Sequence, residues 1–207
     1  MKYLMAAFVL CLVNPIGCLH KQVVVRDVQD ESSISALLRV AVKIETESGS
    51  GSGVAVGPRR ILTALHVVSG RARIFARSAY TFCSLKMVKA DPMNDLALME
   101  SSCELPLWAS VATGDLWVGQ RCTAVGYQNG LDTPTVTDGR LQETDLRIRY
   151  SAPGWMGSSG GPVFVRENGR WRIVSVTLAV YVGGPGIPIV ALMLGAPREA
   201  VSGLIGG

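Results

Sequence analysis

The sequence predicts an all-β protein in which two antiparallel barrels are joined by a linker. Short apolar or alternating runs recur between turns rich in glycine and proline, a pattern typical of barrel strands. No helical period competes with these runs except near the C-terminus. The 207 residues, of which 48% are hydrophobic and 17% charged, are enough to bury a sizeable core. We therefore expect a globular protein with two similar β units.

The first barrel is expected over residues 36–108, where six strand-like runs follow one another. The first run alternates apolar and charged side chains with a period of two, as a half-buried strand should. Turn residues separate the runs, which favours antiparallel pairing of consecutive strands. The runs cover residues 38–44, 54–56, 61–63, 71–77, 81–89 and 95–99.

The second barrel is expected over residues 120–195, after a linker at 109–119 that has little periodicity. Residues 197–201 predict a short C-terminal helix, and the polar residues 19–35 predict a tether with a helical turn near its end. The strand-like runs of this barrel cover residues 121–127, 135–144, 146–150, 163–166, 171–180 and 187–194.

Residues 1–18 have the pattern of a secretory signal peptide. Lys2 supplies a positive charge, residues 4–13 are apolar, and Pro15 precedes small residues. A retained N-terminal anchor is the alternative, although the apolar run is short for a membrane span. The end of this leader also resembles a bacterial lipoprotein signal that would be lipidated at Cys18, except that Pro15 stands where leucine is usual. We expect export, to the cell envelope or beyond, with membrane association through the N-terminus if the leader or a lipid remains.

Charge and cysteine content exclude several classes of site. The net charge is only +4, and the arginine pairs near residues 59, 71 and 147 lack interleaved aromatics, so they predict solvated strand faces and no nucleic-acid partner. Outside the leader the number of cysteines is odd, so at least one thiol is free or forms an intermolecular bond. Cys83 and Cys103 are the first pair to test for a disulfide. Cys122 is expected to be buried. Without a Cys-x-x-Cys motif or a second histidine outside the leader, we expect no metal and no cofactor.

The most informative stretch is residues 157–162, with the sequence GSSGGP. Its glycines leave backbone N–H groups free to converge on an oxygen that gains negative charge, beside the exposed hydroxyl of Ser159. An ordinary surface turn is the alternative reading of such a run.

A serine nucleophile needs a base and an orienting acid. His66 is the candidate base, because the other histidine, His20, lies in the leader. Asp95 stands between His66 and Ser159 in the sequence, at the start of an apolar strand. Taken alone, His66 could be a core histidine and Asp95 a turn cap. Together they complete the order His, Asp, Ser.

These motifs resemble the trypsin/chymotrypsin-like serine protease family, and in particular its compact bacterial and viral members. The resemblance covers roughly residues 36–195 and implies chymotrypsin-like architecture, with two antiparallel six-stranded β-barrels and the active site between them. Its matching stretches are GSGVAV at 51–56, ILTALH at 61–66, NDLAL at 94–98 and GSSGGP at 157–162.

The resemblance also implies roles for individual residues. Ser159 would attack the scissile carbonyl, His66 would carry the proton, and Asp95 would orient the imidazole. The backbone N–H groups of Gly157 and Ser159 would form the oxyanion hole. Ser158 replaces the aspartate that binds a freed N-terminus in zymogen-activated members, so activation of that kind is not expected.

Specificity is predicted from the same alignment. Pro153 would lie at the floor of the primary pocket, where trypsin-like specificity places an aspartate, so cleavage after lysine or arginine is not expected. Val174 replaces the histidine of glutamate-specific relatives, which leaves an apolar or small side chain as the preference. Trp155 and Met156 would rim the pocket. Substrate would pair as an added strand with the wall segment, predicted at Ser175, Val176 and Thr177.

The function predicted is therefore a monomeric serine endopeptidase that acts on a polypeptide substrate through an acyl-enzyme. Two alternatives remain at this point. One is a catalytically silent two-barrel protein that binds peptides or partners in the cleft. The other is a viral protease that processes its own precursor.

Overall fold

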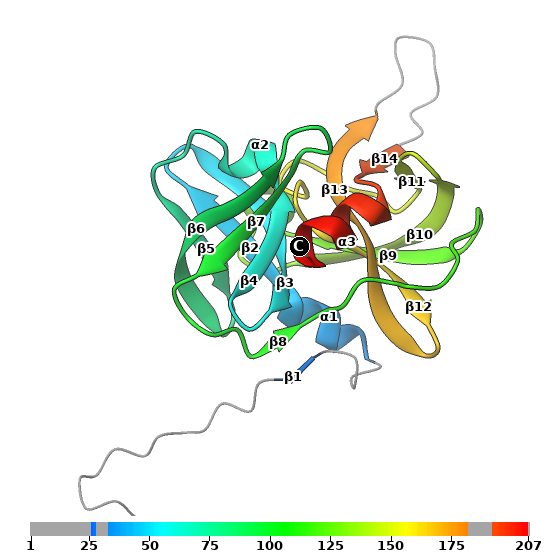
Figure 1. Cartoon of the computed structure of the whole chain (residues 1–207), viewed down its shortest axis with the longest axis horizontal. Helices are drawn as coiled ribbons and strands as arrows, with labels where there is room; N and C mark the ends of the chain where they lie inside the picture. The colour runs from blue at the N-terminus through cyan, green and yellow to red at the C-terminus, as the bar shows by residue number, and fades with distance from the viewer. Residues whose placement is uncertain (1–25, 28–32, 182–191, 207) are drawn as a thin grey trace, which may run out of the picture.

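Two closed six-stranded antiparallel barrels make up most of the protein (Figure 1). The computed structural model describes residues 26–27, 33–181 and 192–206. The strand order is β2-β3-β4-β7-β6-β5 in the first barrel and β10-β11-β14-β13-β12-β9 in the second. Figure 1 shows the barrels side by side, with the C-terminal helix α3 across the front of the boundary between them. The predicted fold class is confirmed.

The first barrel closes through pairing of its first strand with β5, from Lys43 opposite Arg77 to Thr46 opposite Ile74. Alternate side chains point inward and form a core that includes Ile44, Ile61 and Met99, all fully buried. The strands are β2 (Ala41–Thr46), β3 (Gly49–Gly57), β4 (Arg60–Ala64), β5 (Ile74–Ser78), β6 (Thr81–Asp91) and β7 (Leu96–Ser101).

The second barrel follows after residues 109–120, which carry only an isolated bridge from Val111 to Ile173. Its core includes the fully buried Leu141, Ile148 and Val163. The strands are β9 (Arg121–Gly126), β10 (Thr135–Thr144), β11 (Ile148–Tyr150), β12 (Pro162–Glu167), β13 (Arg170–Tyr181) and β14 (Leu192–Gly195).

A separate apolar cluster joins the barrels. Leu62 and Leu96 of the first barrel pack in the same cluster as Phe164 and Val176 of the second, and all four are fully buried. Helices α1 (Ile34–Val40) and α3 (Arg198–Gly206) add side chains to this cluster. Because protein interiors are close-packed, this shared core holds the two barrels in one fixed relation.

Three short elements complete the fold. The one-turn helix α2 (Leu65–Val68) follows β4, and the 3-10 turn η2 (Gln128–Gly130) follows β9. A two-residue parallel ladder joins β1 (Arg26–Asp27) to β8 (Leu107–Trp108). Both α2 and η2 contribute to the site described below.

The structure corrects two strand predictions. Residues 38–40 are helical, because α1 buries Ala36, Leu37 and Val40 on one face against the inter-barrel cluster, and this packing outweighs the alternating pattern. Residues 71–73 precede β5, since the N–H groups of residues 72 and 73 bind the carboxylate of Glu47. The C-terminal helix is present and runs beyond the predicted residues 197–201, to Gly206.

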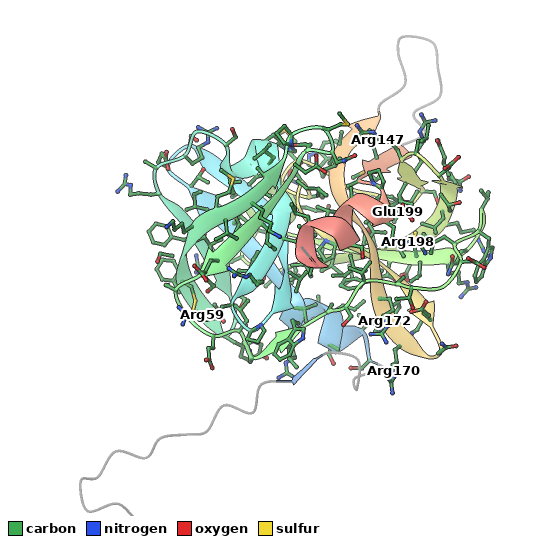
Figure 2. The ribbon with its side chains drawn as sticks, viewed as in Figure 1. Arg59, Arg147, Arg170, Arg172, Arg198 and Glu199 are labelled. Atoms are coloured by element: carbon green, nitrogen blue, oxygen red, sulfur yellow. A yellow bond between two sulfur atoms is a disulfide. The ribbon has the colours of Figure 1, made fainter. Side chains whose placement is uncertain are left out.

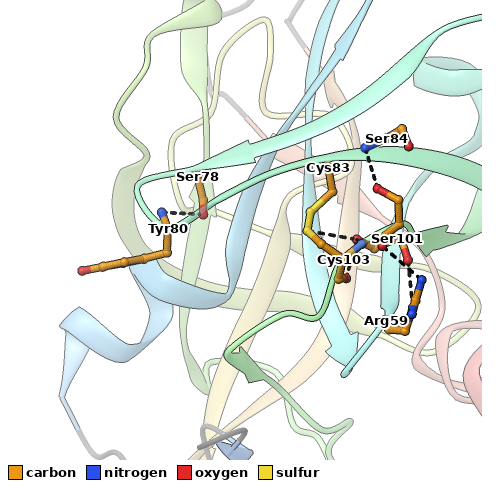
Figure 3. Close-up of a disulfide and its surroundings, with 8 residues drawn as sticks. Arg59, Ser78, Tyr80, Cys83, Ser84, Ser101 and Cys103 are labelled. Carbon is orange, nitrogen blue, oxygen red and sulfur yellow. Dashed lines mark hydrogen bonds between the residues drawn. A yellow bond between two sulfur atoms is a disulfide. The ribbon is translucent and has the colours of Figure 1, made fainter. Parts of the chain in front are cut away.

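Cys83 and Cys103 form a disulfide, and Cys122 is a buried free thiol (Figure 3). Burial, assisted by the nearby Asp138, raises the pKa of Cys122 to about 12. The segment around Cys103 is also bound to its surroundings, because Arg59 donates to the carbonyl of Ser101 at 3.1 Å.

Figure 2 shows the labelled arginines spread over the molecule, with Arg59 on the first barrel, Arg147, Arg170 and Arg172 on the second, and Arg198 on α3. Several arginines are in ion pairs, including Arg60 with Glu100 at 3.1 Å. The leader at residues 1–18, most of the predicted tether and residues 187–191 of the last predicted strand lie outside the described residues. Within the part of the chain that is described, no helix has the length and apolar character needed to cross a membrane.

Candidate active site

His66 and Asp95 come from the ends of two neighbouring strands. β4 and β7 are antiparallel and end with Ala64 opposite Leu96, so the residues just beyond this pair meet. His66 lies in α2, immediately after β4, and Asp95 immediately precedes β7. A rigid barrel edge therefore positions both side chains.

Three hydrogen bonds define the geometry of this pair. Nδ1 of His66 lies 2.6 Å from Oδ2 of Asp95, and the backbone N–H of His66 donates to Oδ1 at 2.9 Å. The N–H of Leu65 donates to the backbone carbonyl of Asp95 at 2.9 Å. An ionised carboxylate can only accept, so Nδ1 carries the proton in this bond and Nε2 is left as the acceptor. The His66 side chain is 47% exposed, which leaves its ring accessible to a substrate.

The turn that carries Ser159 is fastened between the two barrels. The N–H of Ser52, in β3, donates to the carbonyl of Ser159 at 2.7 Å, and the N–H of Gly160 donates to Thr177 in β13 at 2.8 Å. Gly160 has φ 86°, and a Cβ there would overlap the carbonyl oxygen of Ser52 and Oγ1 of Thr63. Only glycine fits this position.

Ser159 lies on the side of the turn that approaches α2. A Cβ added at Gly51 would be 2.7 Å from Val67, the neighbour of His66, and 3.1 Å from the carbonyl oxygen of Ser159. The Ser159 hydroxyl donates to the carbonyl of Leu178 over 3.4 Å, a long and weak bond. Among the described residues, no hydrogen bond joins this hydroxyl to His66.

The N–H groups of Gly157 and Ser159 make no hydrogen bond to any described residue. The carbonyls of the same two peptide groups are both bound: Met156 O accepts from Asn129 N at 2.6 Å, and Ser158 O accepts from Gly161 N at 2.9 Å. In a trans peptide the N–H and C=O point in opposite directions. Both N–H groups are therefore aimed away from the packed turn and are available to an anionic oxygen.

An apolar cavity of about 210 Å³ adjoins Ser159. Of the described residues that line it, none is charged. Trp155 and Met156, the predicted rim residues, are 58% and 77% exposed. Pro153 does not line this cavity but borders a smaller enclosed void beside it. The residues around the cavity are Trp155, Met156, Ser158, Ser159, Thr177, Ala179 and Met193.

The predicted wall segment, Ser175 to Thr177, lies in β13. Ser175 and Val176 are fully buried; Ser175 donates to Ala196 O at 2.6 Å, and Val176 pairs with Pro162. Of the three predicted residues, Thr177 alone lines the cavity, followed by Ala179. The β13–β14 register shifts between Thr177 and Ala179, and a sequence pattern does not reveal such a bulge. Pairing of a substrate with Ser175, Val176 and Thr177 stays a prediction.

Sequence reasoning missed two residues at this site. Ser52 is fully buried in β3, where its hydroxyl donates to Gly157 O at 2.6 Å and accepts from Tyr127 N at 2.8 Å. Lys43 is 7% exposed, although the alternating pattern predicted a solvent-facing charge, and its ammonium donates to Gly130 O at 2.7 Å. The signal for Ser52 was its place in the matching stretch at 51–56, but the predicted strand began only at residue 54, whereas β3 begins at Gly49.

No group of three or more potential metal ligands occurs within residues 26–27, 33–181 and 192–206. The site consists of an acid–base pair, a serine and two backbone donors. These groups can carry out acyl transfer with protein groups alone.

Known structures share this fold at low sequence identity. Rv3671c from M. tuberculosis H37Rv, in an inactive serine-to-alanine form, has a TM-score of 0.71 and 20% identity over 86% of this chain and 90% of its own. The serine endoprotease from Yersinia pestis has a TM-score of 0.71 and 20% identity, over 82% of this chain and 62% of its own. The MamO protease domain from Magnetospirillum magneticum, in its apo form, has a TM-score of 0.67 and 22% identity over 81% and 96%.

None of the curated proteins matches the chain by sequence. The family assignment rests on residues 51–174, which match the trypsin-like peptidase domain. This segment covers more than half of the chain and includes His66, Asp95 and Ser159. The chain belongs to the trypsin-like peptidase family and is a serine endopeptidase that acts on polypeptides.

Proposed function

We propose that this peptidase cleaves peptide bonds with Ser159 as nucleophile, His66 as general base and Asp95 as the orienting acid. The observation that carries the proposal is the contact of 2.6 Å between Nδ1 of His66 and Asp95, reinforced by the backbone bond of 2.9 Å to the same carboxylate. A histidine held in this way presents Nε2 as a proton acceptor next to the serine turn.

In the first step, Ser159 Oγ forms a bond to the scissile carbonyl carbon while its proton moves to Nε2 of His66. The electron pair of the C=O π bond moves to oxygen, and the N–H groups of Gly157 and Ser159 stabilise this anion. The C–N bond then breaks, and His66 returns the proton to the leaving amine. Water repeats the sequence on the acyl-enzyme. To begin, the hydroxyl exchanges its weak bond with Leu178 O for one with His66, a rotation about a single side-chain torsion.

We also propose that an apolar or small residue precedes the scissile bond. The cavity of about 210 Å³ beside Ser159 offers contacts with Trp155, Met156 and Met193, and its lining, as far as residues are described, includes no acid to pair with lysine or arginine. The Leu178 carbonyl, next to the nucleophile, is suited to accept a substrate N–H in an added-strand arrangement.

The proposed place of action is outside the cytoplasm. The predicted leader directs export, with cleavage, retention or lipidation at Cys18 as its possible fates. The Cys83–Cys103 disulfide supports this proposal, because disulfides persist in oxidising compartments.

Labelling with a fluorophosphonate probe tests the function. The wild-type protein should react, Ser159→Ala should not react at all, and His66→Ala should react at least about 10³-fold more slowly. Ser48→Ala, in an exposed turn, is the matched control and should label like the wild type.

A specific observation favours a second candidate, since the Ser159 hydroxyl is bound to Leu178 and not to His66. This candidate is a catalytically silent cleft that binds peptides. It would be supported by wild-type protein that unfolds cooperatively yet does not label.

A further inference from the structure

The peptide group between Met156 and Gly157, here called the oxyanion peptide, carries one of the two proposed oxyanion donors. It is bound by the turn at residues 127–132. Asn129 donates its N–H to Met156 O at 2.6 Å, and this carbonyl belongs to the same peptide group as the Gly157 N–H. Asn129 and Gly130 have positive φ values of 53° and 71°, which direct the Asn129 N–H toward the peptide. If Met156 O were released, the peptide group could rotate and carry the Gly157 N–H out of the oxyanion position.

This turn belongs to the second barrel in sequence but is bound by the first. Lys43 of β2 donates to Gly130 O at 2.7 Å and to Oδ1 of Asp132 at 3.0 Å, and it is 7% exposed. The hydrogen bond from Lys43, with the nearby Arg77, holds the pKa of Asp132 below its usual range. A buried ammonium needs such partners, so the lysine and the turn stabilise each other.

A second bridge from the first barrel reaches both sides of the oxyanion peptide. Ser52 donates its hydroxyl proton to Gly157 O at 2.6 Å and accepts the N–H of Tyr127 at 2.8 Å. A Cβ on Gly157 would overlap the carbonyl oxygen of Tyr127, so the turn at 127–132 and the loop that carries Gly157 are in direct contact. Ser52 is fully buried, and its hydroxyl has no solvent to replace these partners.

The serine before the nucleophile makes only a local contact. Oγ of Ser158 accepts the N–H of Trp155 at 3.1 Å, within the same loop. Two side chains of the opposite barrel, Lys43 of β2 and Ser52 of β3, therefore support this loop from positions distant in the sequence.

We propose that Lys43 and Ser52 are positioning residues that keep the oxyanion hole formed, so that transition-state stabilisation depends on contact between the barrels. This inference rests on the proposed function and adds to it the groups that shape the hole. Neither residue touches the substrate. Both act through carbonyls that orient the Gly157 peptide, so their loss should affect the reacting state more than ground-state binding.

The test compares Ser52→Ala and Lys43→Met with matched controls on exposed positions of β6, Ser84→Ala and Lys86→Met. With a peptide substrate, each test variant should lower kcat by about 10- to 100-fold and change KM by less than about threefold, because one oxyanion donor is worth about 10² to 10³ in rate. Both controls should stay within about twofold of the wild type.

A peptide aldehyde separates positioning from general loosening. Its carbonyl carbon adds Ser159 Oγ, the serine proton passes to His66, and the new oxygen anion enters the hole. Aldehyde affinity should fall by the same factor as kcat, whereas affinity for the matching peptide alcohol should be unchanged.

Asp132→Asn keeps the inference testable if Lys43→Met or Ser52→Ala fails to fold. The Asp132 side chain is 65% exposed and tolerates the change, and kcat should fall about 3- to 10-fold as the ion pair weakens. Unchanged kcat in the folded variants, or equal loss of aldehyde and alcohol affinity, would overturn the inference. Failure of the proposed function is a different result, because the wild type itself would then lack activity.

Discussion

The His66–Asp95 pair is built inside one barrel, whereas the Ser159 turn is shared between two. The pair uses the adjoining ends of β4 and β7, with contacts of 2.6 to 2.9 Å that stay within the first barrel. The turn precedes β12 of the second barrel but binds Ser52 of the first through its backbone and through Gly157. Ordering of the acid–base pair thus needs one folded barrel, and ordering of the oxyanion donors needs two.

This difference predicts an order of loss when the molecule is weakened. A change at the boundary between the barrels should disturb the oxyanion donors while His66 and Asp95 keep their contact. A change within the first barrel, away from the boundary, should lower stability and spare the donors. The changes described below test this contrast, beginning with the largest effect.

Asp95→Asn should lower kcat by about 10⁴-fold, because an amide stabilises the wrong imidazole tautomer and cannot balance the imidazolium charge. The backbone N–H of His66 can still donate to the amide oxygen, so the fold should be retained. Steady-state kinetics with thermal unfolding checks both parts. Asp115→Asn, at an exposed position in the segment between the barrels, is the control and should keep nearly full activity. A fall of less than tenfold for Asp95→Asn would mean that this carboxylate does not orient the base.

Gly160→Ala should be the most destabilising change at the boundary, by at least about 3 kcal/mol. The new methyl group would overlap Ser52 O and Thr63 Oγ1 and would require an unfavourable positive φ. Gly169→Ala is matched, because Gly169 has φ 77° with nothing within 4 Å of the added carbon, and should cost only about 1 to 2 kcal/mol. Urea unfolding measures both free energies. Equal losses would show that the boundary is loosely packed at Gly160.

Much of this architecture could be predicted from the sequence, because strands and turns leave local patterns. The order of apolar runs predicts both barrels, and short motifs led to His66 and Asp95, which the structure brings to 2.6 Å. The contacts of Lys43 and Ser52 are different, since they join residues 87 and 105 positions apart. Such pairings depend on how the barrels dock, and nothing local in the sequence records them.

The residues that line the cavity show the same limit of sequence reasoning. Alternation over 171–180 gave no reason to place Ser175 inside and Ala179 at the cavity, because the ladder shifts register between Thr177 and Ala179. A bulge changes which face a side chain joins without changing the composition of the strand.

Breaking the disulfide should weaken the first barrel without disturbing the boundary. Loss of Cys83–Cys103, whose partners are 20 positions apart, should lower the free energy of unfolding by about 3 kcal/mol. Activity under native conditions should persist, because the bridge joins β6 to the segment after β7 (Figure 3), and Ser159 lies in neither. Urea unfolding of the wild type with and without dithiothreitol measures the effect. The double variant Cys83→Ala/Cys103→Ala is the control and should not respond to the reductant; a response would implicate another thiol.

Alkaline titration of Tyr127 should give the smallest effect and reports on the boundary itself. Burial raises the pKa of Tyr127 to about 12, partly opposed by Arg77. The folded state therefore keeps the phenol neutral while the unfolded chain ionises near its usual pKa of about 10. This contribution, about 2 kcal/mol, is complete below about pH 10 and is lost as the pH rises toward 12.

Tyr127→Phe should remove this alkaline loss of stability, because phenylalanine cannot ionise, and should make the free energy of unfolding less dependent on pH between about 10 and 12. The variant loses only a long hydrogen bond of 3.4 Å to Ala41 O, so its stability near neutral pH should change by less than about 1 kcal/mol. Tyr150→Phe is the comparison inside the second barrel, because burial also raises the pKa of Tyr150. If ionisation of Tyr127 loosens the boundary, kcat of the wild type should fall at a lower pH than the pH at which the protein unfolds. Tyr127→Phe should bring these two pH values together. Tyr150→Phe should leave them apart. A gap that is the same in all three proteins would mean that the oxyanion turn does not depend on this face of the boundary.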